Sequence, residues 1–251
     1  MTLRFTFLLL LAATVPAFAQ ERIPTPLTLD QIVAKNVAAK GGVNALQALK
    51  SLKLSGRVLV RGGQIQLGFS QTRKRPGAVR SEATMQGMTG IEAFDGSTGW
   101  KVMPFQGRKE PERMAADDAK ALVEEAEMDG PLVDWKAKGS AVENLGTEEV
   151  EGTQALKLKV TRKNGDVTLV YLDPDAFLEI RTVTQRTVHG AQMEIETNFG
   201  DYEKVGDIFV PFALESGPRG SSDKQTIVIE KAEPNVPVDD ALFQFPVTPN
   251  R

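Results

Sequence analysis

The fold is decided by residues 155–217, a stretch that begins ALKLKVTRKNGDVTLVY (residues 155–171). Apolar and polar side chains alternate here with a period of two, which is typical of a strand with one buried face and one solvated face. Asn164-Gly165 interrupts the alternation, and this dipeptide favours a tight hairpin. Further turn signals follow at Asp173-Pro174, His189-Gly190 and Gly206-Asp207. The stretch therefore predicts an antiparallel meander.

One face of this meander is expected to be apolar. Its predicted members are Leu156, Leu158, Val160, Val167, Leu169, Tyr171, Met193 and Ile195. Charged residues such as Lys157, Glu194 and Glu196 alternate with them and are expected to face water. Such an apolar face must be covered, either by the protein itself or by a ligand.

The residues before residue 155 predict two short helices followed by more strands. Thr28 and Gln31 have the spacing of a capping box, and Gly41-Gly42 ends that helix. A second short helix is predicted over residues 43–49. From Ser51 onward the period changes to that of strands, with hairpin turns at Gly62-Gly63 and at residues 95–96.

A third helix is predicted over residues 112–127, where alanine, glutamate and lysine are frequent and glycine is absent. Pro111 suits the first turn of such a helix. Its apolar side includes Met114 and Leu122, whereas Glu124 and Glu125 are expected to face water. A helix inserted among strands is one way to cover an apolar sheet face. We therefore expect this helix to act as a lid.

The whole pattern predicts a mainly β (α+β) protein with about ten or eleven strands, helices covering one face and no internal repeat. After the last predicted strand, residues 236–246 are expected to be extended and to dock two phenylalanines. No segment of residues 20–251 has the composition of a linker between domains, so these residues are expected to form a single domain.

Residues 1–19 have the features of a secretory signal peptide: Arg4, a short apolar run and Ala17-Phe18-Ala19 before Gln20. A retained anchor is the alternative, but the apolar run is short for a membrane span. The chain has no cysteine, hence no lipid attachment site, and this suits a bacterial periplasm. Without Arg4, 29 basic and 33 acidic residues leave a net charge of −4, which argues against a nucleic-acid partner.

No catalytic motif stands out. His189 is the only histidine and precedes a glycine in a predicted turn. Glu194 and Glu196 share a strand face and could act as an acid pair, but they alternate with Met193 and Ile195, which favours the solvated face of the sheet. Asp173 and Asp175 could bind calcium, although a turn explains them too. We expect no enzyme, no metal site and no cofactor.

Two further features allow a functional or a purely structural interpretation. Met85, Met88 and Ile91 lie among glycines and could form an adaptable apolar surface or ordinary core. The basic triplet of residues 73–75 could contact anionic headgroups or a partner, or could be a solvated turn.

Several short segments resemble the LolA-like outer-membrane lipoprotein-sorting proteins. These segments are Ala38-Ala39-Lys40-Gly41-Gly42, residues 45–52 with Ser55-Gly56, Tyr171-Leu172-Asp173-Pro174 with Leu178-Glu179-Ile180, Phe199-Gly200-Asp201-Tyr202 with Val210-Pro211-Phe212, and Pro237 to Phe245. The resemblance covers nearly all of residues 20–251. It implies an unclosed antiparallel β-barrel whose helices cover the concave face, and a cavity that binds acyl chains.

The resemblance also implies a function: a periplasmic carrier or chaperone for an acylated lipoprotein or lipid, with inner- and outer-membrane transport proteins as partners and a monomeric state. An envelope sensor, a protein-interaction domain and a hydrolase are the alternatives. The expected cavity residues are Leu54, Val58, Leu67, Phe69, Met88, Ile91, Trp100, Val102, Met114, Leu122, Leu156, Leu158, Val160, Leu169, Tyr171, Ile180, Met193 and Ile195.

Overall fold

The computed structural model describes residues 27–246, so the predicted signal peptide lies outside the described part of the chain. Thirteen strands form one antiparallel sheet. They are β1 Ser51–Val60, β2 Ile65–Lys74, β3 Ala78–Met85, β4 Met88–Phe94, β5 Gly99–Met103, β6 Arg108–Arg113, β7 Ala141–Val150, β8 Thr153–Thr161, β9 Val167–Leu172, β10 Glu179–Val188, β11 Ala191–Val205, β12 Ile208–Pro218 and β13 Gln225–Pro234. The helices are α1 Leu29–Ala39, α2 Val43–Ala48 and α3 Lys120–Glu125, with short 3₁₀ turns at Pro104–Gln106 and Asp240–Leu242.

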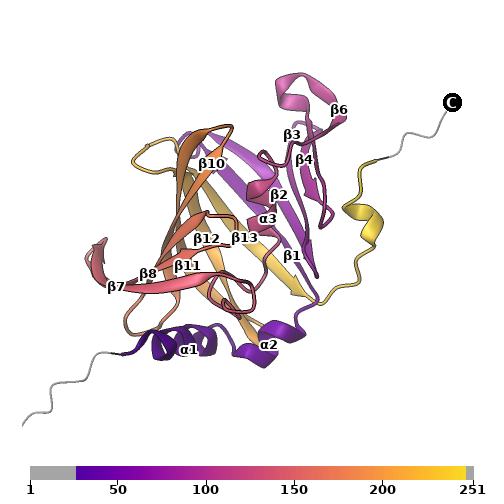
Figure 1. The fold of residues 1–251 in the computed structure, drawn as a ribbon. Helices are drawn as coiled ribbons and strands as arrows, with labels where there is room; N and C mark the ends of the chain where they lie inside the picture. Colours follow the sequence, from indigo (N-terminus) through magenta and orange to yellow (C-terminus); the bar gives the residue numbers. More distant parts are fainter. Residues whose placement is uncertain (1–26, 247–251) are drawn as a thin grey trace, which may run out of the picture.

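The strand order is β6-β5-β4-β3-β2-β1-β13-β12-β11-β10-β9-β8-β7, and every neighbouring pair for which a register is defined is antiparallel. The first and last strands, β1 and β13, are partners in the middle of the sheet, while β6 and β7 form its two edges. The sheet curls around α3, and α1 and α2 lie at one end of the curve (Figure 1). This confirms the predicted unclosed antiparallel barrel, with more strands than the ten or eleven expected.

The first two helices form as predicted. The Thr28 hydroxyl oxygen accepts a hydrogen bond from the Gln31 backbone N–H at 3.3 Å, and the Thr28 N–H donates to the Gln31 side chain at 2.8 Å. Gly41 follows the helix with a positive φ of 118°, and a Cβ there would lie 2.1 Å from the Asp207 carbonyl oxygen. Only glycine permits this approach of α1 to the β11–β12 turn. Within residues 27–246, none of the helices is long and apolar enough to cross a membrane.

The main core lies between the helices and the concave face of the sheet. Ile32 of α1 packs with Leu158 and Val170 of the strands near β7. Leu46 of α2 packs with Leu54 of β1 and with neighbouring strands β12 and β13. Because these helices already fill that end of the barrel, an open space can remain only farther along the concave face.

The predicted helix over residues 112–127 is wrong over its first half. Residues 108–113 form edge strand β6, in which Arg113 lies opposite Trp100 and Glu112 opposite Lys101 of β5. Pro111 is tolerated because an edge strand does not need every N–H group for the ladder. Strand pairing thus overrides helix propensity at residues 112–113. Residues 114–119 are irregular or form turns, and only Lys120–Glu125 is α-helical.

The predicted apolar face of the β8–β9 hairpin is also wrong. Leu158 lies opposite Val170, and Lys157 lies opposite Tyr171. Residues directly opposite each other share a face, so Leu158 faces the helices while Tyr171 lies on the convex face. There Tyr171 packs in a small cluster with Leu169, beneath the ammonium group of Lys157, 5.5 Å from the ring centroid.

The C-terminal segment docks its two phenylalanines, as predicted, and it does so on the convex face of β5. Phe243 is buried, and its carbonyl oxygen accepts a hydrogen bond of 2.7 Å from the indole N–H of Trp100. The Phe245 ring meets the Trp100 ring edge-on at 6.3 Å. Trp100 therefore holds the C-terminal segment in place and does not line the cavity, where it was expected to bind a ligand.

Candidate ligand-binding cavity

A cavity of about 760 Å³ lies between the concave face of the sheet and the segment that contains α3. It is walled by strands from both halves of the sheet, with β1 to β4 on one side and β10 to β13 on the other. Its apolar lining residues are Ala83 and Ala121 together with the larger Leu54, Val58, Val60, Leu67, Phe69, Ile91, Met103, Phe105, Val188, Met193, Ile195, Phe199, Leu214, Ile227 and Ile229.

The strand register places five of these side chains in one row across five strands. Leu67 lies opposite Val58, and Val58 lies opposite Ile227. Ile227 lies opposite Leu214, which in turn lies opposite Phe199. Because directly opposed residues share a face, this row forms a continuous apolar floor for the cavity.

The two glutamates of α3 attach it to opposite walls of the cavity. The Glu125 carboxylate accepts hydrogen bonds from the Gln71 amide at 3.1 Å and from the Ser81 hydroxyl at 3.3 Å. The Glu124 carboxylate accepts one from the Thr184 hydroxyl at 3.0 Å, and it pairs with an Arg186 amino group at 2.5 Å. Adjacent residues of α3 thus span the opening between β2–β3 and β10.

Burial perturbs the charged groups at this end of the cavity. Removal from water raises the pKa of Glu125 above its usual value, although the nearby positive charge of Arg73 opposes the rise. The same burial lowers the pKa of Arg73, with Glu125 opposing the fall. Burial also raises the pKa of Glu92, against the effect of Lys101. This end of the cavity therefore favours uncharged carboxyl groups more than water does.

Of the cavity residues expected from sequence, seven line the cavity. They are Leu54, Val58, Leu67, Phe69, Ile91, Met193 and Ile195. All of them lie on β1, β2, β4 and β11, in the two facing halves of the sheet.

The other expected residues lie elsewhere. Leu156, Leu158 and Val160 belong to the core beside α1. Leu169, Tyr171 and Ile180 belong to the convex cluster. Trp100 and Val102 alternate along β5 with the lining residue Met103. Met114 and Leu122 pack in the core between α3 and β3–β4. Met88 is exposed at the start of β4.

Sequence reasoning missed the polar residues of the cavity. Glu124 and Glu125 point inward, whereas their helical positions predicted contact with water. The basic triplet is divided among three directions: Arg73 lines the cavity, Lys74 pairs with Asp240 at 2.6 Å, and Arg75 pairs with Asp129. Alternation along β2 was a usable signal for Arg73, because Leu67, Phe69 and Gln71 lie on the same face.

The residues considered for chemistry have structural partners. An imidazole nitrogen of His189 lies 2.9 Å from an Asp118 carboxylate oxygen, and the pair is exposed. Glu194 pairs with Arg219 at 3.1 Å and Glu196 pairs with Lys224 at 3.0 Å. Within residues 27–246, no three His, Cys, Asp or Glu side chains are grouped as metal ligands.

Known proteins resemble this chain in fold but not in sequence. No model of a known protein family matches it, and no curated protein matches its sequence. Among solved structures, a domain described as an outer membrane lipoprotein-sorting protein from Vibrio parahaemolyticus matches with a TM-score of 0.56 and 11% identity, covering 84% of this chain and 94% of that one.

Two other structures match equally well. A DUF1329 family protein from Desulfovibrio piger has a TM-score of 0.56 and 13% identity, covering 86% of this chain and 97% of its own. A LolA superfamily protein from Nitrosomonas europaea has a TM-score of 0.56 and 11% identity, covering 87% and 98%. The protein therefore has a LolA-like fold.

Proposed function

We propose that this protein is a non-enzymatic periplasmic carrier or chaperone that holds acyl chains of a lipid or lipoprotein in its cavity. The observation that carries the proposal is the cavity of about 760 Å³, with its continuous apolar floor, beneath α3. Core helices α1 and α2 fill one end of the barrel but leave this space open. Pockets that bind small molecules are mostly apolar concavities of this size with a few polar groups.

Burial of chain methylenes would supply the affinity, at about 0.8 kcal/mol for each methylene. Met103 and Met193 line the cavity and can adapt to chains of different shape. One of the similar structures is described as a lipoprotein-sorting protein, which supports the same class of ligand.

The charged residues that line the cavity indicate which kind of acyl-chain ligand it prefers. Its lining includes six acidic residues and only two basic ones, Arg73 and Arg186. Two of these carboxyl groups, Glu92 and Glu125, have a raised pKa because they are buried. The same loss of hydration would disfavour an anionic group of a ligand at this end of the cavity. We therefore expect the cavity to prefer a chain whose polar end is neutral.

Extraction tests the proposal directly. Protein purified from its native host should release lipid in a stoichiometric amount into organic solvent, identified by mass spectrometry. Emptied protein should then bind the neutral fluorophore N-phenyl-1-naphthylamine, and long-chain alcohols should displace it. Protein that carries no lipid and takes up no fluorophore would contradict the proposal.

The periplasmic location depends on residues 1–19. Periplasmic extracts of the host should contain the protein with Gln20 as its first residue, which N-terminal sequencing can show. A protein that keeps Met1 and remains with the cytoplasmic fraction would refute this part of the proposal without affecting the cavity.

A further inference from the structure

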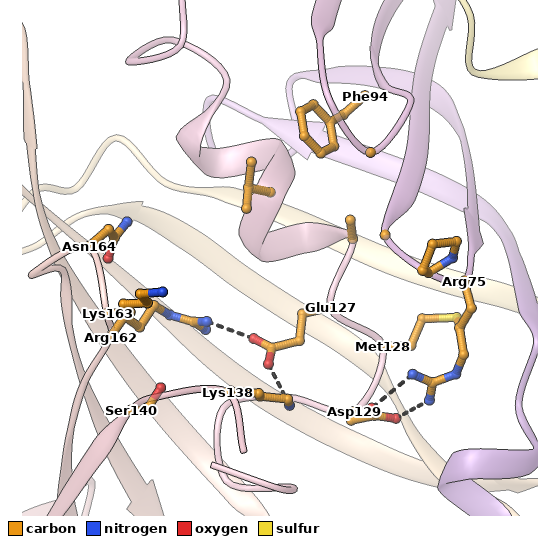
Figure 2. A pocket seen from close by; sticks show the side chains of 15 residues that line it. Arg75, Phe94, Glu127, Met128, Asp129, Lys138, Ser140, Arg162, Lys163 and Asn164 are labelled. Carbon is orange, nitrogen blue, oxygen red and sulfur yellow. Dashed lines mark hydrogen bonds and ion pairs between the residues drawn. The ribbon is translucent and has the colours of Figure 1, made fainter. Parts of the chain in front are cut away.

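A second pocket, of about 530 Å³, lies beside the C-terminal end of α3 (Figure 2). It is bordered by the β2–β3 turn, the end of β4, the segment after α3 and the β8–β9 turn. It shares no lining residue with the apolar cavity. Glu124 and Glu125 of α3 line the cavity, whereas Val123 of α3 and Ala126, which caps the helix, line this pocket. The two spaces are therefore separate candidate sites.

The pocket has an excess of positive charge. Four basic residues line it, and only two acidic ones, Glu127 and Asp129. Arg75 binds Asp129 through two guanidinium nitrogens. Glu127 lies between Lys138, at 2.6 Å, and Arg162, at 2.8 Å (Figure 2). Both carboxylates are thus neutralised by residues of the pocket itself.

Two cationic groups retain capacity for a ligand. Lys163 has no ion pair or hydrogen bond within the described residues 27–246, and its side chain extends past Gly139 beside the pocket. The Arg162 guanidinium is near Glu127 but is not aligned for a hydrogen bond with it, and its Nε is buried without a partner in that part of the chain. A buried N–H group without an acceptor is unfavourable, so ligand oxygens at this position would be stabilised.

The opposite side of the pocket carries apolar side chains beside the paired Arg75 and Asp129 (Figure 2). Phe94, Met128 and Val123 contribute to it, and the Val123 side chain is exposed despite lying next to the core residue Leu122. Figure 2 shows Phe94 on the far side of the pocket from Lys163 and Arg162. An apolar surface opposite the Lys163 ammonium group and the unpartnered Nε of Arg162 suits a molecule with an anionic group on an apolar body.

We propose that this pocket binds an anionic group, a phosphate or a carboxylate, carried on an apolar body. Arg162 and Lys163 contact the anion, and Phe94 and Val123 contact the apolar part. The site is independent of the proposed acyl-chain cavity, whose six carboxylic side chains disfavour an anion. The anion can come from the headgroup of an acidic lipid or from free phosphate.

Calorimetric titration of the mature chain distinguishes these sources. The probes are dodecyl phosphate, inorganic phosphate and the neutral dodecyl maltoside. Both dodecyl compounds are kept below their critical micelle concentrations, and N-phenyl-1-naphthylamine occupies the cavity in every titration. Dodecyl phosphate should bind more tightly than either of the others. If inorganic phosphate binds as tightly as dodecyl phosphate and the pocket variants lose this binding, the anion site is supported with free phosphate as its ligand. The contribution of an apolar body to binding would then be refuted.

The main variant is Lys163→Gln, because Lys163 has no described partner whose loss would disturb the fold. Loss of one charge-assisted hydrogen bond should weaken dodecyl phosphate binding about tenfold. Arg162→Gln should weaken it at least as much. Lys204→Gln, which removes an equal charge from a β11 lysine outside both pockets, should leave affinity unchanged.

Two results would overturn the proposal. Dodecyl phosphate binding that is equal in wild type and both pocket variants would show that the anion binds elsewhere. Equal weakening by Lys204→Gln would show that only the overall charge matters. The fluorophore signal reports on the cavity in the same samples, so failure of the anion site and failure of the acyl-chain cavity give different results.

Discussion

Ala83→Phe tests whether the cavity holds an acyl chain. Ala83 lines the cavity, and it lies between Phe69 of β2 and Gly90 of β4. The Phe105 ring lies over Gly90, 3.3 Å from where a Cβ would be. A new phenyl ring at position 83 would therefore extend into the open volume beside two existing rings.

The expected loss follows from the methylenes that the ring displaces. If the six carbons of the ring exclude at least two chain methylenes, at about 0.8 kcal/mol each, binding weakens by about 1.6 kcal/mol. That is roughly 15-fold in affinity. The loss should apply to a chain long enough to fill the cavity, whereas a short chain that stops before residue 83 should bind as in the wild type.

The assay is displacement of N-phenyl-1-naphthylamine by hexadecanol and by octanol. Thr84→Phe is the matched control, because Thr84 is the next residue of β3, is exposed and lies on the opposite face of the strand. Its affinity for both alcohols should equal that of the wild type. Unchanged hexadecanol binding in Ala83→Phe, or an equal loss in Thr84→Phe, would refute the assignment of the cavity.

Three further predictions concern stability. Trp100→Phe removes the hydrogen bond to the Phe243 carbonyl and should lower the unfolding free energy by about 1 kcal/mol. Backbone amides near the C-terminus should also exchange faster. Unchanged exchange would contradict the role of Trp100 in holding the C-terminal segment. Leu158→Ala leaves a hole beside Ile32 and should cost about 2–5 kcal/mol in urea unfolding, more than an exposed Leu242→Ala. For Glu125, the folded pKa lies above the ordinary 4.5, so its contribution is present below that pH and is lost as pH rises through the folded pKa. Glu125→Gln removes this loss, and its unfolding free energy relative to the wild type should rise with pH above about 4.5; a difference independent of pH would count against the burial of this carboxyl.

Local signals in the sequence determined most of the secondary structure. The capping box at Thr28, the alternation along β8 to β12 and the turns at His189-Gly190 and Gly206-Asp207 all depend on residues within a few positions of one another. Such signals identify strands and turns without knowledge of the rest of the chain. They also sufficed for the docking of the C-terminal phenylalanines.

Which face each strand buries required the tertiary structure. Asn164-Gly165 as a two-residue turn would pair Lys163 with Asp166. In the structure the Arg162 backbone N–H donates a hydrogen bond of 2.8 Å to the Asp166 carbonyl oxygen, so the turn between them has three residues, 163–165. This difference of one residue moves every side chain of β9 to the other face relative to β8. Tyr171 is therefore on the convex side and not in the cavity.

The inward position of the α3 glutamates also depended on long-range contacts. Isolated helix periodicity places Glu124 and Glu125 in water, because charged side chains are costly to bury without partners. Their partners, Arg186, Gln71 and Ser81, come from strands far away in the sequence. The sequence by itself thus determined the strands, the turns and an apolar surface in need of cover. Only the tertiary structure decided which side chains line the cavity, because strand register and distant ion pairs are not encoded in local spacing.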